Sequence, residues 1–194
     1  MNWETYLAFG DSITIGARTY LGYPELVGHN LGIHLAKQWN VINHSASGLK
    51  AIDLARHIDK SFFSLKEHKA SISTILIGTN DIKENTGIED FTISLNQVIL
   101  KTRLLTVNEN VLLIAIPEFH KGIIYPYSIV MNERIALFNI EIEKISKSHN
   151  IRMITLSHTE NDFLDGVHLN QNGIVTFSDQ ITNYILKDKG IQRG

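Results

Sequence analysis

Short runs of apolar residues alternate with longer segments in which apolar residues recur every three or four positions, and this alternation constrains the fold more than any other feature. Each run is strand-sized, and its apolarity is continuous rather than alternating. Strands with this pattern are buried on both faces, as in a parallel sheet. We therefore predict strands at residues 6–9, 40–42, 72–77, 111–116 and 151–156.

The segments between these runs carry apolar residues at helical spacing. Phe91, Leu95 and Val98, for example, are four and three positions apart, which places them on one face of a helix. The first segment is the least regular, because Gly28 and Gly32 both have low helix propensity. We predict helices near residues 24–39, 52–62, 91–102, 131–145 and 174–184.

Strands that alternate with helices predict an α/β protein with right-handed crossovers and helices on both faces of one parallel sheet. The length of 194 residues suits a single domain, residues 1–194. The chain has no cysteine, which excludes a disulfide scaffold, a zinc finger and a cysteine nucleophile. Its formal net charge of −2 provides no electrostatic footprint for nucleic acid or for an anionic membrane.

The first five residues contain no basic stretch, and no apolar run approaches the roughly 18 residues that a transmembrane helix requires. We therefore expect a cytoplasmic protein whose partner is a small molecule rather than a nucleic acid or a membrane. The sequence contains no heptad seam and does not indicate the number of subunits.

Ligands of parallel α/β sheets bind at the carboxyl ends of the strands, so we look for chemistry in the segments that follow each predicted strand. The first of these segments contains Gly10-Asp11-Ser12. Taken alone, Ser12 is more often a helix cap or a turn residue than a nucleophile. A serine becomes a nucleophile only where a base is positioned to remove its proton.

A candidate base comes late in the chain, where Asp165 precedes His168 by three residues. On a tight turn this offset brings the carboxylate to the imidazole, so that Nδ1 donates to Asp165 and Nε2 is free to accept the serine proton. The alternative is that Asp165 caps a helix and His168 is an ordinary loop residue. One such pair is weak evidence in a chain with nine histidines.

Two further segments contain hydrogen-bond donors for a developing oxyanion. The side-chain amide of Asn80 follows the third predicted strand, and Gly48 presents a backbone N–H with no side chain beside it. The backbone N–H of Ser12 would be a third donor. Asn80 could instead form an Asx turn, and Gly48 could simply start a helix. The combination favours catalysis, because these residue types all fall at the ends of different strands of one sheet.

With these motifs, the sequence resembles the SGNH (GDSL-type) hydrolases. The matching blocks occur in family order: Gly10-Asp11-Ser12-Ile13-Thr14-x-Gly16, Asn43 to Gly48, Gly78-Thr79-Asn80-Asp81 and Asp165-Gly166-Val167-His168. The resemblance implies a three-layer α/β/α sandwich of flavodoxin-like type with a central five-stranded parallel sheet. It also implies that Ser12 is the nucleophile, His168 the base and Asp165 its orienting carboxylate. The implied oxyanion hole consists of the Ser12 and Gly48 N–H groups and the Asn80 side chain.

One block departs from the family pattern, since Ser45 stands where the second block often has an inner glycine. Gly48 itself is present, so the departure concerns the loop shape rather than the donor. We interpret Asp11 and Asp81 as carboxylates that order the loops.

The resemblance implies a serine esterase that forms an acyl-enzyme and needs no metal and no organic cofactor. We expect Asp11, His44, Phe119 and His120 to border the substrate. The aromatic residues of the 117–127 loop could stack on a sugar, although Phe119 could equally pack over the sheet. The two histidines lack the carboxylate spacing of a metal site, so we predict none.

The chain has no obvious lid, which favours short acyl groups such as acetyl on a carbohydrate. A lysophospholipid or thioester substrate is one alternative, and a non-catalytic ligand-binding protein of the same fold is another. A flavodoxin-like nucleotide site is disfavoured, because Asp11 would repel a phosphate after the first strand.

Overall fold

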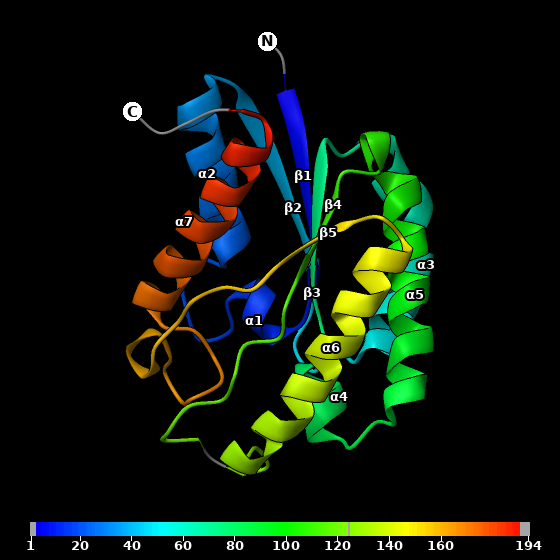
Figure 1. Cartoon of the computed structure of the whole chain (residues 1–194). Coiled ribbons are helices and arrows are strands. Elements are labelled where there is room, and N and C mark those ends of the chain that lie inside the picture. Colours follow the sequence, from blue (N-terminus) through cyan, green and yellow to red (C-terminus); the bar gives the residue numbers. More distant parts are fainter. Residues whose placement is uncertain (1–2, 124, 191–194) are drawn as a thin grey trace.

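The computed structural model describes residues 3–123 and 125–190, so the first two residues and residue 124 of the 117–127 loop lie outside the described residues. Within this part of the chain, five parallel strands form one sheet in the order β2-β1-β3-β4-β5 (Figure 1). The strands are β1 (Trp3–Gly10), β2 (Gln38–Ser45), β3 (Ile72–Leu76), β4 (Val111–Ile114) and β5 (Arg152–Ile154).

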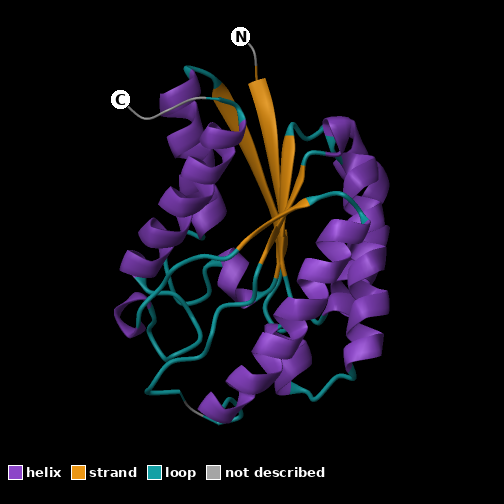
Figure 2. Ribbon diagram, viewed as in Figure 1, coloured by secondary structure: helices purple, strands orange, loops and turns teal. Residues whose placement is uncertain are grey.

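Helices cover both faces of the sheet, which confirms the predicted α/β/α architecture (Figure 2). On one face α2 (Tyr23–Leu35) packs against α7 (Gln171–Asp188). The other face carries α3 (Ala51–Glu67), α5 (Ile88–Leu105) and α6 (Asn132–Ser148). Two shorter helices follow strands directly: α1 (Ser12–Ile15) after β1 and α4 (Thr79–Lys83) near the end of β3. Single 3₁₀ turns occur at η1 (Val107–Glu109), η2 (Ile129–Met131) and η3 (Glu160–Asp162).

Each face of the sheet has its own hydrophobic core, because successive side chains of a strand point to opposite faces. In β1, Leu7 and Phe9 belong to the core under α3, α5 and α6, whereas Tyr6 and Ala8 belong to the core under α2 and α7. All four side chains are fully buried. The prediction of strands buried on both faces is therefore confirmed for β1, and β3 and β4 show the same burial.

The same prediction is wrong for the two outer strands. Most residues of β2 and all three residues of β5 are only partly buried. Both strands lie at an edge of the sheet, where one flank has no neighbouring strand. Continuous apolarity in the sequence therefore does not separate a central strand from an edge strand.

The predicted helix at residues 24–39 is also too long. Helix α2 ends at Leu35, because Ala36 adopts a left-handed backbone conformation and donates its N–H to the carbonyl of Gly32. Trp39, which we placed in this helix, lies in β2. The strands predicted at residues 111–116 and 151–156 are shorter as well, and end at Ile114 and Ile154.

The register of the strands explains where a site forms. Gly10, the last residue of β1, pairs with Ser45 of β2 and with Leu76 of β3. The three strands thus end at the same level, and the segments that follow them lie side by side. Because β2 and β3 flank β1 on opposite sides, this is the switch point of the sheet, where ligands of such folds bind.

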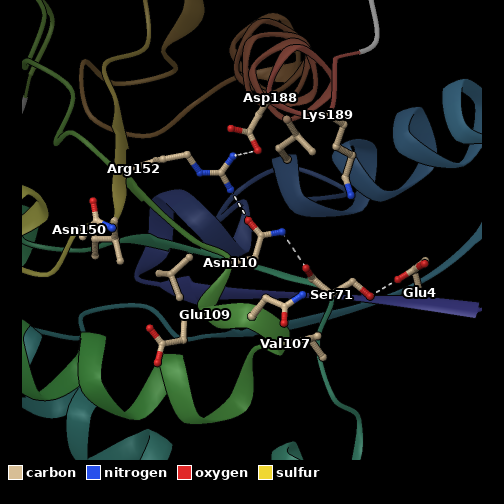
Figure 3. A pocket seen from close by; sticks show the side chains of 13 residues that line it. Glu4, Ser71, Val107, Glu109, Asn110, Asn150, Arg152, Asp188 and Lys189 are labelled. Carbon is tan, nitrogen blue, oxygen red and sulfur yellow. Dashed lines mark hydrogen bonds and ion pairs between the residues drawn. The ribbon is translucent and has the colours of Figure 1, made fainter.

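A hollow lies at the opposite, amino edge of the sheet (Figure 3). Its volume is about 510 Å³, and its lining includes Glu4, Ser71, Asn110, Arg152 and Asp188. These side chains bind one another: Arg152 contacts Asp188 and Asn110, and Ser71 contacts Glu4. These five side chains are therefore engaged with one another within the fold.

None of the helices in residues 3–123 and 125–190 is both long enough and apolar enough to cross a membrane.

Candidate active site

The first element of the site is the sharp turn that leads from β1 into α1. Gly10 has no room for a side chain, because a Cβ there would lie 2.1 Å from Thr14 Oγ1 and 2.5 Å from the Leu76 carbonyl oxygen. Asp11 caps α1 by accepting the Ile13 N–H at 3.0 Å. Ser12 is thus the first helical residue and not the cap, which excludes the structural alternative that the sequence left open for it.

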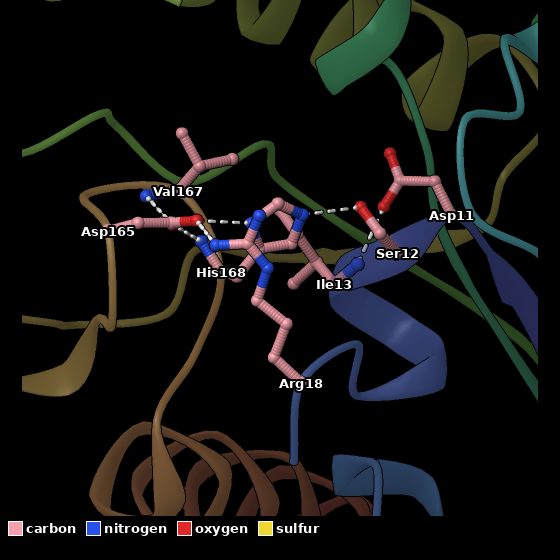
Figure 4. Close-up of polar contacts among 7 residues, drawn as sticks. All are labelled: Asp11, Ser12, Ile13, Arg18, Asp165, Val167 and His168. Atoms are coloured by element: carbon pink, nitrogen blue, oxygen red, sulfur yellow. Dashed lines mark hydrogen bonds and ion pairs between the residues drawn. The ribbon is translucent and has the colours of Figure 1, made fainter. Parts of the chain in front are cut away.

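Ser12, His168 and Asp165 form one chain of hydrogen bonds, although Ser12 and His168 are 156 residues apart in the sequence (Figure 4). Ser12 Oγ lies 3.1 Å from His168 Nε2, and His168 Nδ1 lies 2.8 Å from Asp165 Oδ2. A carboxylate only accepts hydrogen bonds, so the Nδ1 proton points to Asp165 and Nε2 is left to accept the Ser12 hydroxyl proton. The structure therefore brings together the three residues that the sequence singled out.

A tight turn between Asp165 and His168 fixes the imidazole. Asp165 Oδ1 accepts the N–H groups of Val167 at 3.1 Å and of His168 at 2.8 Å. Burial acts to raise the pKa of Asp165, but the hydrogen bonds from the His168 backbone and imidazole outweigh burial and hold this pKa below its ordinary value. Asp165 is therefore a carboxylate that orients His168 at neutral pH.

The structure adds Arg18, which the sequence analysis missed. Its Nη1 donates to Asp165 Oδ2 at 2.7 Å, the same oxygen that binds the His168 imidazole (Figure 4). Arg18 lies in the loop after α1, and 147 residues separate it from Asp165. No local pattern in the sequence marks this pairing, because it depends on how two distant loops meet.

The three expected oxyanion donors lie at the ends of β1, β2 and β3. The Ser12 N–H belongs to the first residue of α1 and has no acceptor within that helix. Gly48 has a φ of +80°, a conformation that favours glycine, and its N–H has no acceptor among the described residues. Asn80 Nδ2 donates to the Leu49 carbonyl at 3.0 Å and lies 3.4 Å from Asp11 Oδ2. The second contact is long, so one amide hydrogen remains available to a closer acceptor.

Two carboxylates lie beneath these donors. Burial raises the pKa of Asp11 to about 7 and the pKa of Asp81 to about 6. Asp81 accepts the Ala51 N–H at 2.9 Å and so fixes the start of α3. Both side chains order loops, as predicted. The expectation that Asp11 also borders the substrate is wrong, because Asp11 has no exposed surface.

Phe119 does not border the substrate either. Its side chain is 2% exposed and belongs to the core beneath α3, α5 and α6. Its N–H and carbonyl are both held by the Asn132 side chain, which fixes the loop over the sheet. The packing alternative considered for Phe119 is therefore the observed one.

The two histidines expected near the substrate have other contacts. His44 stacks on His57 of α3, with ring centroids 4.2 Å apart. His120 donates its backbone N–H to the Gly166 carbonyl, and its Nε2 lies 2.8 Å from His158 Nδ1. His120 thus supports the turn that carries Asp165 and His168 from behind, and the described contacts do not join His44 to this turn.

Tyr127 is an aromatic residue of the 117–127 loop whose phenol interacts electrostatically with two carboxylates of the candidate site. Its ring packs edge-on against Phe119, with centroids 5.3 Å apart. Burial raises the pKa of Tyr127 to about 12, and the negative charges of Asp11 and Asp165 add to this rise. Its phenol is therefore within electrostatic range of both carboxylates.

Within the described residues, no group of three or more histidine, aspartate or glutamate side chains could hold a metal ion.

Comparisons with known proteins identify the family of the chain. A family model described as the GDSL-like Lipase/Acylhydrolase family matches residues 8–174, a span that contains every residue of the candidate site. A search of curated protein sequences gives no match.

Solved structures share the fold at low sequence identity. AlAXEase, described as an acetyl xylan esterase, is 22% identical with a TM-score of 0.76, over 93% of this chain and 99% of that chain. LAE5, described as an alpha/beta hydrolase enzyme from the metagenome of Lake Arreo, Spain, is 18% identical with a TM-score of 0.75, over 98% and 97%. A catalytic mutant of Axe2, an acetylxylan esterase from Geobacillus stearothermophilus, is 18% identical with a TM-score of 0.74, over 98% and 97%.

Proposed function

We propose that this chain, which belongs to the GDSL-like lipase/acylhydrolase family and is a carboxylic ester hydrolase, cleaves its ester through an acyl-enzyme on Ser12. The observation that carries this proposal is the hydrogen-bond chain from Ser12 through His168 to Asp165. Ser12 and Gly48, whose N–H has no acceptor among the described residues, follow neighbouring strands that end at the same level, at the switch point of the sheet.

In the first half of the reaction, Ser12 Oγ attacks the carbonyl carbon of the ester while His168 Nε2 takes the hydroxyl proton. The carbonyl oxygen becomes an oxyanion that accepts hydrogen bonds from the Ser12 and Gly48 N–H groups and the Asn80 amide. Asp165 stabilises the imidazolium. The bond to the alcohol oxygen then breaks, and His168 gives its proton to that oxygen.

In the second half, water attacks the acyl carbon and His168 takes a proton from it. The bond to Ser12 Oγ breaks, the proton returns to Ser12, and the carboxylic acid leaves. Besides the ester and one water molecule, both halves use side chains and backbone groups of this chain.

We further propose that the substrate is a short acyl ester, such as an acetyl group on a carbohydrate. Tyr127 supports this substrate class, because a partly buried aromatic ring whose phenol interacts electrostatically with Asp165 offers an apolar surface against which a sugar ring can stack. Two of the similar structures are described as acetyl xylan esterases, which agrees with a small acyl group on a sugar.

A serine-directed phosphonate probe tests the nucleophile. We expect stoichiometric labelling of the wild-type protein at Ser12, found by peptide mass spectrometry, and no labelling of the Ser12→Ala variant. A wild-type protein that is folded but unlabelled would instead indicate a non-catalytic ligand-binding protein.

A series of acetyl, butyryl and octanoyl esters of one chromogenic alcohol tests the acyl group. We expect kcat/KM to be highest for acetyl. A kcat/KM that rises with chain length would contradict the short-acyl proposal and favour a lysophospholipid or thioester.

The role of Tyr127 is tested by Tyr127→Ala with an acetylated xylo-oligosaccharide and with a chromogenic acetyl ester. We expect KM to rise for the oligosaccharide alone, and Tyr125→Ala to change neither constant, because Tyr125 is 94% exposed. Equal effects of Tyr127→Ala on both substrates would argue against stacking.

A further inference from the structure

We infer that Arg18 is a positioning residue for the proposed reaction: its ion pair with Asp165 fastens the loop of the nucleophile to the loop of the base and moderates how strongly Asp165 stabilises a positively charged imidazole. This inference rests on the proposed function. It concerns a residue that touches neither Ser12 nor the reacting atoms in the structure.

The first observation is the way the loop presents Arg18. Helix α1 is closed by Gly16 and by the Ala17 N–H, which donates to the Ser12 carbonyl at 3.0 Å. The Thr19 N–H and hydroxyl both donate to the Gly16 carbonyl, at 3.0 and 2.6 Å. Arg18 lies between them with a φ of +71°, a conformation that non-glycine residues rarely adopt. The backbone is therefore held in an uncommon shape that turns Arg18 toward Asp165.

The second observation is the full set of donors on the Asp165 carboxylate. Oδ1 accepts two backbone N–H groups of its own turn, from Val167 and His168. Oδ2 accepts the imidazole of His168 and the guanidinium of Arg18. Among the described residues, Arg18 is thus the donor to Asp165 that comes from outside the 165–168 turn.

A mechanical consequence follows from this connectivity. In the described part of the chain, two hydrogen bonds join residues 11–22 to residues 157–168: the Ser12–His168 contact and the Arg18–Asp165 pair. The first of these must break and re-form during each catalytic cycle, when His168 carries a proton between atoms. Arg18 therefore holds the two loops in register while the Ser12–His168 contact is broken.

An electrostatic consequence follows from the shared oxygen. Asp165 stabilises a positive imidazole, and the positive charge of Arg18 on the same oxygen offsets part of that stabilisation. A neutral side chain at position 18 would therefore leave Asp165 to stabilise the positive imidazole more strongly. The Arg18 side chain is 58% exposed, so solvent screens this effect to a modest size.

Other charged and titratable groups face the Asp165–His168 turn from the elements packed against it. Tyr127 comes from the loop after β4, and His120 with His158 from behind Gly166, whereas Asp11 stands next to Ser12 in the chain. Burial raises the pKa of Asp11 to about 7, so Asp11 also titrates near neutral pH. The test therefore compares variants that differ at position 18 alone.

The experiment measures kcat, KM and the pH dependence of kcat/KM on a neutral chromogenic acetyl ester. For Arg18→Gln we expect kcat to fall about tenfold with KM within about twofold. We also expect the acid limb of kcat/KM to move to higher pH by about 0.5 to 1 unit. Arg18→Lys keeps the positive charge, so its acid limb stays at the wild-type position and its kcat is partly restored.

Arg56→Gln is the matched control, because Arg56 pairs with Asp53 of its own helix α3 and is 68% exposed. We expect wild-type constants for it. The thermal unfolding midpoints of all three variants should stay near the wild-type value, since each removes an exposed side chain.

Each contrary result has a separate meaning. If Arg18→Gln keeps the wild-type kcat and pH profile, the inference is overturned. If Arg18→Gln raises KM alone, Arg18 binds substrate and positions nothing, which also overturns it. If the phosphonate probe fails to label wild-type Ser12, the proposed function is contradicted. This labelling is therefore measured before the variants are compared.

Discussion

The two edges of the sheet both carry polar side chains, but these are arranged differently. At the amino edge, Glu4, Ser71, Asn110, Arg152 and Asp188 bind one another in one network that lines a hollow (Figure 3). At the carboxyl edge, the chain of hydrogen bonds that starts at Asp165 ends on the Ser12 hydroxyl. Gly48 offers an N–H without a partner among the described residues.

The difference teaches that a polar hollow alone is a poor guide to an active site. A closed network stabilises the fold, because each donor already has its acceptor. A site for catalysis needs donors and acceptors whose hydrogen bonds are completed only by the substrate or the transition state. Both edges contain a serine, an aspartate and an asparagine. Matched substitutions can therefore distinguish a network that stabilises the fold from a site that serves catalysis.

The largest expected contrast is between two serines. Ser12→Ala removes the proposed nucleophile, so we expect kcat on an acetyl ester to fall by about 10⁶-fold, to background. Ser71→Ala removes the hydroxyl that contacts Glu4 at the amino edge and should leave kcat within about twofold. Steady-state assays of both variants decide this point, and an active Ser12→Ala enzyme would contradict the acyl-enzyme.

The second contrast is between two aspartates. Asp165→Asn keeps the shape of the side chain but disturbs the tautomer of His168, and we expect a fall in kcat of about 10⁴-fold. Asp188→Asn weakens an ion pair with Arg152 whose aspartate side chain is 48% exposed, and we expect unchanged activity. Similar losses in both variants would mean that the fold, rather than the proposed charge relationship, accounts for the effect.

The third contrast is between two asparagines. Asn80→Ala removes one proposed oxyanion donor, and we expect kcat to fall by about 10²–10³-fold with little change in KM. Asn110 donates to the Ser71 carbonyl at 2.8 Å, so Asn110→Ala should cost about 1–2 kcal/mol of unfolding free energy and no activity. Urea unfolding and kinetics on the same preparations measure both effects.

The smallest expected effect concerns how stability depends on pH. Burial raises the pKa of Asp11 from 3.8 to about 7, so the protonated form favours the folded state. This contribution is complete below pH 3.8 and is lost as the pH rises through 7. Asp11→Asn should therefore gain urea stability relative to the wild type as the pH rises from 4 to 8.

Glu4, at the amino edge, should behave in the opposite way. Hydrogen bonds from Lys37 and Ser71 lower its pKa below 4.5, so its contribution is present above that pH and is lost as the pH falls. Glu4→Gln should therefore lose stability at neutral pH and approach the wild type in acid. Unfolding midpoints at several pH values that run parallel for both variants and the wild type would disprove the assigned shifts.

Local pattern was sufficient to predict the central part of the fold. The continuous apolar runs at residues 6–9, 72–77 and 111–116 correspond to β1, β3 and β4, since a strand buried on both faces must be apolar on both. The residues of an edge strand are less strictly apolar, because one flank of the strand has no neighbouring strand and its side chains are only partly buried. Trp39 was misplaced for a related reason: a left-handed residue ended α2 early, and the helical pattern does not reveal that event.

The site was predictable only where residue types and strand ends coincide. Ser12, Gly48 and Asn80 follow three strands that end at one level, and the offset from Asp165 to His168 fits one turn. Asp11 and Phe119 were placed beside the substrate wrongly, because a sequence position at a strand end does not say whether a side chain points inward. Arg18 and Tyr127 act across distant loops, and a single sequence carries no sign of such contacts.

The spacing between Ser12 and His168 also has a consequence for biosynthesis. A chain that is still being translated presents the proposed nucleophile and oxyanion donors early, whereas the proposed base, His168, follows Ser12 by 156 residues. The turn that carries the base also packs against α7, the last helix of the described chain, through Leu169 and Phe163. Under the proposed mechanism, a nascent chain that has not yet reached His168 would therefore be inert toward esters.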